Sequence, residues 1–146
     1  MDSLSVKITL EPTWFNDPPK ITIAANGEAL HDGEITETMT FEQTVDFPED
    51  SDNQLTITLH DKGKYDTEVV NGEIVRDTLV KITAVSIDNV DITGMLPLHK
   101  DLFYYKHDNN GSTELIVDHL YDTMGCNGSA VINFTTPFYV WLLENL

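Results

Sequence analysis

The chain has 146 residues, which is long enough for one domain with a substantial apolar core. Its 25 acidic and eight basic residues give a formal net charge of −17, so nucleic acid and anionic membrane surfaces are excluded as partners. Cations, neutral glycans and protein surfaces remain as partner classes, and a well-solvated surface is the simplest explanation of the acidity.

The N-terminal third shows strand patterns separated by turn signals. Residues 4–10 alternate between apolar and polar, which predicts a strand with one wet face. The proline-containing segment 12–19 breaks this strand and holds Trp14, which we interpret either as a core anchor or as a platform that stacks on a sugar ring. Residues 21–23 predict a second strand that ends at Asn26-Gly27. A long third strand is predicted from apolar residues of one parity, namely Ile35, Met39, Phe41, Val45 and Phe47.

The clearest strand signals lie in the central stretch 54–96. Residues 55–59 alternate strictly between apolar and polar, as expected for a half-buried strand. A polar excursion over 61–77 follows, and it contains the Asn71-Gly72 pair that tolerates positive φ in a tight turn. The chain then returns to strand over 78–87, where β-branched residues dominate. The excursion is therefore expected to be a loop held between two strands.

The C-terminal third is less regular. Residues 103–107 place aromatic and histidine side chains in an expected loop, and aromatic side chains are enriched in the buried centres of interfaces. The closing run is apolar enough to be buried up to Pro137, and we expect a last strand over 138–146, with a short helix as the alternative. The predicted interface residues are Phe103, Tyr104, Tyr105 and His107.

Together these patterns predict an all-β fold. Short strands at regular spacing, without an amphipathic helix or an internal repeat, are typical of an antiparallel β-sandwich, and we expect a jelly roll formed by one domain over 1–146. The single cysteine, Cys126, excludes an intrachain disulfide, and no segment has the length and apolar character of a membrane span or a secretion signal. We therefore expect a protein made in a cytoplasm.

The sequence contains none of the catalytic or nucleotide-binding motifs that carry a recognisable mechanism. No P-loop, dinucleotide fingerprint, nucleophile elbow, zinc-protease or EF-hand pattern occurs, and the five histidines do not fall at the spacing of a zinc set. Catalysis needs a constellation of residues, so we expect that the protein is not an enzyme.

Aspartates around the polar excursion are candidate metal ligands. Calcium takes about six to eight oxygen ligands, and loops between sandwich strands can bring carboxylates together. The candidates are Asp61, Asp66 and Asp77. The interpretation that we favour is that these aspartates cap turns, because aspartate is a preferred turn residue and no dense DxDxDG motif is present. No cofactor is therefore expected, and calcium is the alternative.

Two resemblances refine these expectations. The stretch LTITLHDKGKYDTEVVNGEIVRDTLVKITAVSIDNVDI and the terminal NFTTPFYVWLLENL resemble small virion structural proteins of tailed phages, especially marine T4-like phages and cyanophages. More distantly, a strand followed by Lys62, Asp66-Thr67 and Asp77, and then a strand to Ile87-Asp88, resembles the jelly-roll type of calcium-dependent carbohydrate-binding module. The likeness covers about the C-terminal two-thirds of the chain.

The phage resemblance implies a non-enzymatic virion protein, associated with decoration, tail or fibre, that is made in the host cytoplasm. Its partners would be other virion proteins, with a homo-oligomer in the assembled particle as an alternative. The second resemblance implies a carbohydrate-binding module with a cell-surface glycan as partner, in which Trp14 or Tyr104 stacks on sugar. A further alternative is an accessory domain of a bacterial enzyme.

Overall fold

Thirteen β-strands and one α-helix make up the protein, and the computed structural model describes all 146 residues. One sheet contains β1 (Asp2–Thr13), β4 (Met39–Phe47), β8 (Leu79–Ile87), β9 (Val90–Asp91) and β12 (Thr123–Met124). The other contains β2 (Lys20–Ala25), β3 (Glu28–Glu34), β5 (Asp52–His60), β10 (Phe103–His107), β11 (Ile116–His119) and β13 (Gly128–Thr135). The remaining elements are the hairpin strands β6 (Thr67–Val70) and β7 (Glu73–Asp77), the helix α1 (Phe138–Asn145), and two short 3-10 turns at Lys64–Asp66 and Thr93–Met95.

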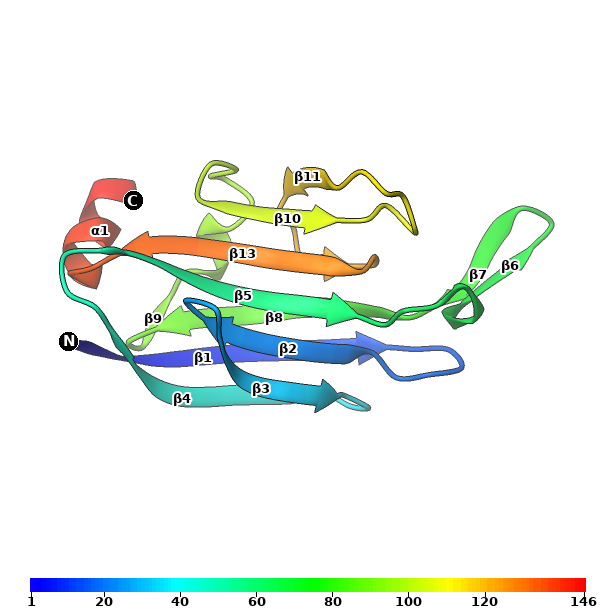
Figure 1. Cartoon of the computed structure of the whole chain (residues 1–146), viewed down its shortest axis with the longest axis horizontal. Helices are drawn as coiled ribbons and strands as arrows, with labels where there is room; N and C mark the ends of the chain where they lie inside the picture. The colour runs from blue at the N-terminus through cyan, green and yellow to red at the C-terminus, as the bar shows by residue number, and fades with distance from the viewer.

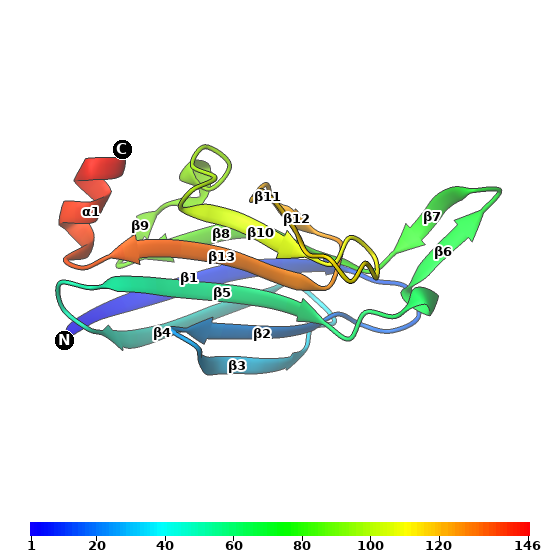
Figure 2. The same cartoon turned by 45° about the horizontal axis from the view of Figure 1, so that its top comes forward.

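All strand pairs are antiparallel. In the five-stranded sheet β8 and β4 flank β1, while β12 and β9 pair with β8. In the six-stranded sheet the order is β11-β10-β13-β5-β2-β3. The β6–β7 hairpin projects from one end of the sandwich, and α1 lies at the opposite end together with both chain termini (Figures 1 and 2).

The core lies between the two sheets. The apolar residues of β5, Leu55, Ile57 and Leu59, are fully buried, while the residues between them are partly exposed. In β1 the residues Val6 and Ile8 are likewise fully buried, so the alternation in the sequence marks the inward face of each sheet. The predicted antiparallel β-sandwich is confirmed.

The expected last strand is wrong, because residues 138–145 form α1. Pro137 precedes the helix, and proline has no N–H for a sheet ladder. Phe138, Trp141 and Leu142 are buried, and their spacing of three and four positions is the period of a helix. No helix of the protein has the length and apolar character needed to span a membrane.

The expected long third strand is also wrong in its start. Ile35 is buried, but it lies in the connection between β3 and β4, which belong to different sheets. The strand expected from Ile35 begins only at Met39. Residues 28–34 form β3, which pairs with β2 across the Asn26-Gly27 turn. The short polar stretch between the two strands lets the chain cross from one sheet to the other.

Candidate functional site

The polar excursion of the sequence forms a hairpin that stands apart from both sheets. β6 and β7 pair only with each other, and Asn71 and Gly72 at the tip have φ values of 54° and 79°, as the predicted tight turn requires. Val69 and Ile74 on the hairpin are 57% and 60% exposed. A two-stranded hairpin is only marginally stable by itself, so contacts at its base must hold it in place.

A cleft of about 410 Å³ lies beside this hairpin. One side is formed by Lys62, Lys64, Thr67 and the exposed aliphatic residues of the hairpin, and the other side by the loops before β11 and before β13. The loop side contributes Asp108, Asn110 and Asn127. The cleft therefore combines a carboxylate, amides and two lysines with two apolar side chains, so its lining is mainly polar.

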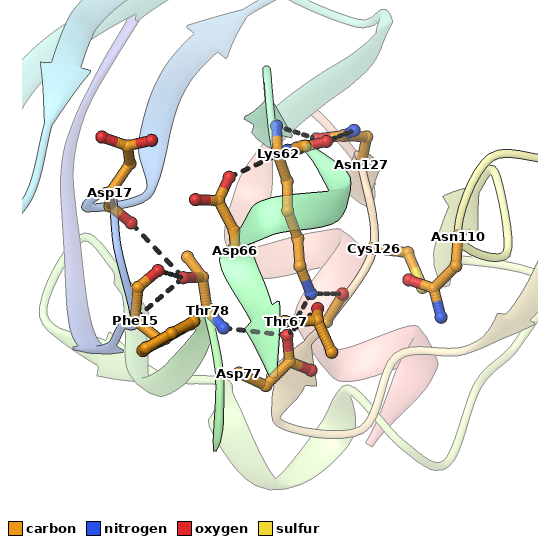
Figure 3. Close-up of polar contacts among 12 residues, drawn as sticks. Phe15, Asp17, Lys62, Asp66, Thr67, Asp77, Thr78, Asn110, Cys126 and Asn127 are labelled. Atoms are coloured by element: carbon orange, nitrogen blue, oxygen red, sulfur yellow. Dashed lines mark hydrogen bonds and ion pairs between the residues drawn. The ribbon is translucent and has the colours of Figure 1, made fainter. Parts of the chain in front are cut away.

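Lys62 fixes the base of the hairpin (Figure 3). Its side chain is only 6% exposed, and the ammonium Nζ lies 2.6 Å from Asp77 Oδ1 and donates to the Gly125 carbonyl oxygen at 2.6 Å. Its main-chain N–H donates to the Asn127 side chain, and its main-chain carbonyl accepts from the same amide, both at 2.9 Å. Lys62 thus joins the loop after β5, the end of β7 and the loop before β13.

Asp77 and Asp66 occupy separate positions near Lys62. Asp77 Oδ1 accepts hydrogen bonds from the Thr67 hydroxyl at 2.7 Å and the Thr78 N–H at 2.8 Å, in addition to the Lys62 contact. Asp66 is buried, and its Oδ2 accepts from the Gly63 N–H at 2.8 Å, whereas its Oδ1 has no hydrogen-bond partner. Figure 3 shows the two carboxylates at opposite ends of the Lys62 side chain.

Asp61, the third candidate metal ligand, shares no contact with Asp66 or Asp77. It pairs with His60 at 3.0 Å on the surface, and this hydrogen bond holds the pKa of Asp61 below its ordinary value. No group of three or more histidine, cysteine, aspartate or glutamate side chains is arranged to hold a metal ion. The alternative in which Asp61, Asp66 and Asp77 converge on calcium is therefore not supported by this geometry, because the three carboxylates have different partners.

The predicted glycan residues lie apart from each other. Trp14 follows β1 and is 43% exposed, and its indole N–H donates to the Thr36 carbonyl at 3.3 Å. Tyr104 is half-buried in β10, where it pairs with His119 and Val131 of the neighbouring strands. Sequence reasoning missed Tyr65, which is 71% exposed beside the hairpin, although a lone tyrosine in a polar stretch is a signal for it.

The predicted interface loop over 103–107 is wrong, because these residues form strand β10. Phe103, Tyr105 and His107 are buried, so these three side chains face the protein interior rather than a partner. The Tyr105 hydroxyl makes hydrogen bonds with the main chain of Cys126, and His107 pairs with Asp118 at 2.6 Å. The Tyr105 hydroxyl thus positions the loop before β13, and a contact through the half-buried Tyr104 stays a prediction that no comparison tests.

Cys126 has the environment of a structural residue. Its thiol donates to the Asn110 side-chain oxygen at 3.3 Å, and burial raises the pKa of the Cys126 thiol. The thiolate that a nucleophile requires is therefore disfavoured. Cys126 and Asn110 link the two loops that form one side of the cleft (Figure 3).

Among known proteins, only solved structures are similar to this chain. No family model and no curated protein sequence matches this chain. Among solved structures, the carbohydrate-binding module vCBM60 in complex with galactobiose aligns with a TM-score of 0.50 at 10% identity, over 88% of this chain and 98% of that one. The selenomethionine form of vCBM60, from work on a circular permutation that links two families of calcium-dependent carbohydrate-binding modules, gives a TM-score of 0.52 at 9% identity, over 88% and 89% of the two chains.

These alignments show a shared β-sandwich fold. They agree with the resemblance to jelly-roll carbohydrate-binding modules and give no support to the resemblance to phage virion proteins. The virion role and the virion location stay predictions that no comparison tests.

The calcium dependence stated for the families of the second structure makes calcium a natural test of this site. Calcium needs about six to eight oxygen ligands. Here Asp77 Oδ1 already faces the Lys62 ammonium and two other donors, and Asp66 Oδ1 is the one buried carboxylate oxygen without a partner. The arrangement of these residues does not fit a calcium ion.

Proposed function

We propose that the protein is a non-catalytic module that binds a neutral glycan at the hairpin end of the sandwich. The observation that carries this proposal is the cleft of about 410 Å³ together with the exposed aromatic residue Tyr65, which lines an adjoining pocket that shares Lys64 and Thr67 with the cleft. The fold shared with vCBM60, which is described in complex with galactobiose, supports the same function class.

The polar side of the cleft supplies hydrogen-bonding groups for sugar hydroxyls. Asn110 is exposed and uses its side-chain oxygen for Cys126, which leaves its amide nitrogen free to donate. The Asp108 carboxylate accepts the Asn110 N–H at 3.1 Å and has further lone pairs for a ligand hydroxyl. A few convergent polar groups of this kind fix the orientation of a ligand in a site.

Tyr65 supplies an aromatic face close to the cleft. It lies in the 3-10 turn at Lys64–Asp66, and the Lys64 ammonium lies 5.0 Å from its ring centroid. An aromatic side chain combines a large apolar face with a polar tip, and sugar rings have apolar faces that can pack on it. Tyr65 lines an adjoining pocket rather than the cleft itself, and the two hollows share Lys64, Thr67 and Val69.

The charge of the chain favours a neutral ligand. A net charge of −17 repels sulfated or uronate-rich polysaccharides over the length of the protein surface. Neutral sugars avoid this repulsion, and their binding depends on the local hydrogen bonds and packing of the cleft.

Binding to a panel of neutral oligosaccharides that includes galactobiose, measured by calorimetry, tests the proposal. We expect Tyr65→Ala to weaken the binding of the recognised sugar by about tenfold or more, as for an exposed aromatic anchor. Tyr139→Ala is the matched control, because Tyr139 is 52% exposed on α1 at the opposite end. Equal affinities of the two variants, or no binding to any neutral glycan, would contradict the proposal.

A second candidate function, docking on neighbouring virion subunits, is supported by a different observation. The hairpin exposes four aliphatic side chains, and clustered exposed apolar residues often mark protein contacts. Amides of β6 and β7 would then be protected from hydrogen exchange in assembled particles. If purified phage particles do not contain this protein, docking on virion subunits is contradicted. The four residues are Val69, Val70, Ile74 and Val75.

A further inference from the structure

A buried ammonium group lies at the junction of the hairpin with the sandwich. Lysine side chains are almost never fully buried unless their charge is paired. The Lys62 side chain is 6% exposed, and its partner Asp77 is 22% exposed, so water screens this pair weakly. Removing the charge would leave the Asp77 carboxylate without its only cationic partner.

The other two lysine ion pairs of the protein are longer and more exposed than the Lys62 pair. The Lys7–Glu42 and Lys81–Asp122 pairs have charged atoms 3.9 and 3.8 Å apart, and each of their side chains is at least half exposed. Pairs of this kind contribute little to stability. The Lys62 pair is shorter and buried, and it adds a bond to a main-chain carbonyl, which indicates a specific structural role.

The oxygens around the Lys62 ammonium are those that a hard metal ion prefers. A carboxylate oxygen of Asp77 and the carbonyl oxygen of Gly125 both lie 2.6 Å from Nζ, and they come from segments far apart in the sequence. Carboxylate and main-chain carbonyl oxygens are also the usual ligands of calcium. The ammonium therefore occupies the point at which these oxygens converge and neutralises the carboxylate from within the chain.

We propose that Lys62 is a built-in cation that joins the β6–β7 hairpin to the loop before β13, so that this end of the protein assembles without a bound divalent metal ion. The inference concerns assembly and stability and does not rest on glycan binding. It separates this chain from modules whose binding depends on calcium. The connection also links a hairpin with exposed apolar residues to the loops on the other side of the cleft.

The first test compares Lys62→Met with Lys64→Met by thermal unfolding. Methionine keeps the length of the side chain and removes the charge, and Lys64 is an exposed neighbour without an ion pair. We expect Tm to fall by roughly 10 °C for Lys62→Met, because an uncompensated charge stays behind, and to change by about 1 °C or less for Lys64→Met. Equal Tm values for the two variants would overturn the proposal.

A double-mutant cycle tests the pairing itself. We expect Lys62→Met combined with Asp77→Asn to regain most of the Tm lost in Lys62→Met, because neither charge then remains buried alone and the asparagine oxygen can still accept from Thr67 and Thr78. Strict additivity of the two single changes would contradict the pairing. If Lys62→Met does not fold, the double variant should still fold, because it contains no unpaired charge.

Metal and amine titrations test the claim that the cation is internal. The wild-type Tm should be the same in EDTA and in millimolar calcium, whereas a calcium-dependent rise of several degrees would overturn the inference. In Lys62→Ala, which leaves space at the junction, ethylammonium should raise Tm because it restores the cation. The same amine should leave the wild type and Lys64→Met unchanged, and an equal rise in all three proteins would contradict the specific role of Lys62.

Discussion

The two ends of the sandwich carry one projecting element each, and they are attached by different physical means. At one end, α1 packs Phe138 and Trp141 into the core: the Trp141 ring lies 6.1 Å from Phe103 and 6.2 Å from Phe134, centroid to centroid. At the other end, the hairpin exposes its aliphatic residues and is attached through the Lys62–Asp77 pair and hydrogen bonds at its base. The helix is thus held by apolar burial, and the hairpin by charge and directional bonds.

This difference has consequences for stability. Apolar burial contributes in proportion to the area removed from water and involves no charge that titrates or is screened. A hairpin with few buried apolar contacts and an exposed ladder is expected to open locally at a lower free energy than the core. We therefore expect changes at α1 and at the buried Lys62 junction to reduce the global free energy of unfolding, and changes in the exposed part of the hairpin to act locally.

The largest effect is expected at the helix end. Trp141 is 3% exposed, so Trp141→Ala should lower the free energy of unfolding by about 3–5 kcal/mol through lost burial and a cavity. Leu143→Ala on the same helix is the control, because Leu143 is 75% exposed, and it should change the free energy by less than about 0.5 kcal/mol. Urea unfolding measures both, and similar losses for the two variants would show that α1 is not attached through its aromatic face.

A smaller and local effect is expected at the hairpin tip. Gly72 has a φ of 79°, where a side chain costs about 1–2 kcal/mol, so Gly72→Ala should raise amide exchange in β6 and β7 about tenfold. Exchange in β5 should not change. Gly94→Ala is the control, because Gly94 has an ordinary φ and an added Cβ would meet no atom within 4 Å. Uniform changes throughout the protein would mean that the hairpin unfolds only with the sandwich.

Apolar periodicity and local turn residues predict part of the structure from the sequence. The alternation in β1 and β5 and the Asn71-Gly72 turn depend on neighbouring residues, and both predictions hold in the structure. The α1 segment was ambiguous, because a run of nearly continuous apolar residues satisfies both a period of two and a helical period. Its buried residues, Phe138, Trp141 and Leu142, follow the helical spacing.

The sequence of β10 contains a strand pattern, although we expected a loop there from its aromatic residues. Phe103, Tyr105 and His107 have the same parity and are buried, while Tyr104 and Lys106 between them are more exposed. An alternation of this kind predicts a strand, even when every second residue is aromatic or histidine. The density of aromatic residues indicated a contact surface, although aromatic residues serve a core equally well.

The hairpin end could not be predicted in the same way. Lys62 and Gly125 are 63 positions apart, and no local pattern indicates that a carbonyl of one loop will meet the ammonium of another. Closely spaced aspartates left a shared metal site as an alternative, but the 3-10 turn directs Asp66 to the Gly63 N–H, and Asp77 at the end of β7 accepts from Thr67. Polar networks depend on the completed fold, so their partners become visible only in three dimensions.

The smallest expected effect is a pH dependence at the helix end. The Tyr139 hydroxyl donates to Asp88 Oδ2 at 2.6 Å, and this hydrogen bond raises the pKa of Tyr139 in the folded state. A raised folded-state pKa means that the contribution to stability is fully present below the unfolded-state pKa, which is about 10, and is lost as the pH rises through the folded-state value. At neutral pH the wild type should therefore have a slightly higher Tm than Tyr139→Phe.

Above about pH 10 the Tm difference between the wild type and Tyr139→Phe should shrink, because the ionised phenolate cannot donate and repels the Asp88 carboxylate. Tyr121→Phe is the control, since Tyr121 is 63% exposed and its hydroxyl makes no hydrogen bond in the structure. Near-UV circular dichroism across the pH range measures all three proteins. A Tm difference for Tyr139→Phe that stays constant from neutral to alkaline pH would show that the Asp88 contact does not persist in solution, and that burial of Phe138 and Trp141 alone attaches the helix.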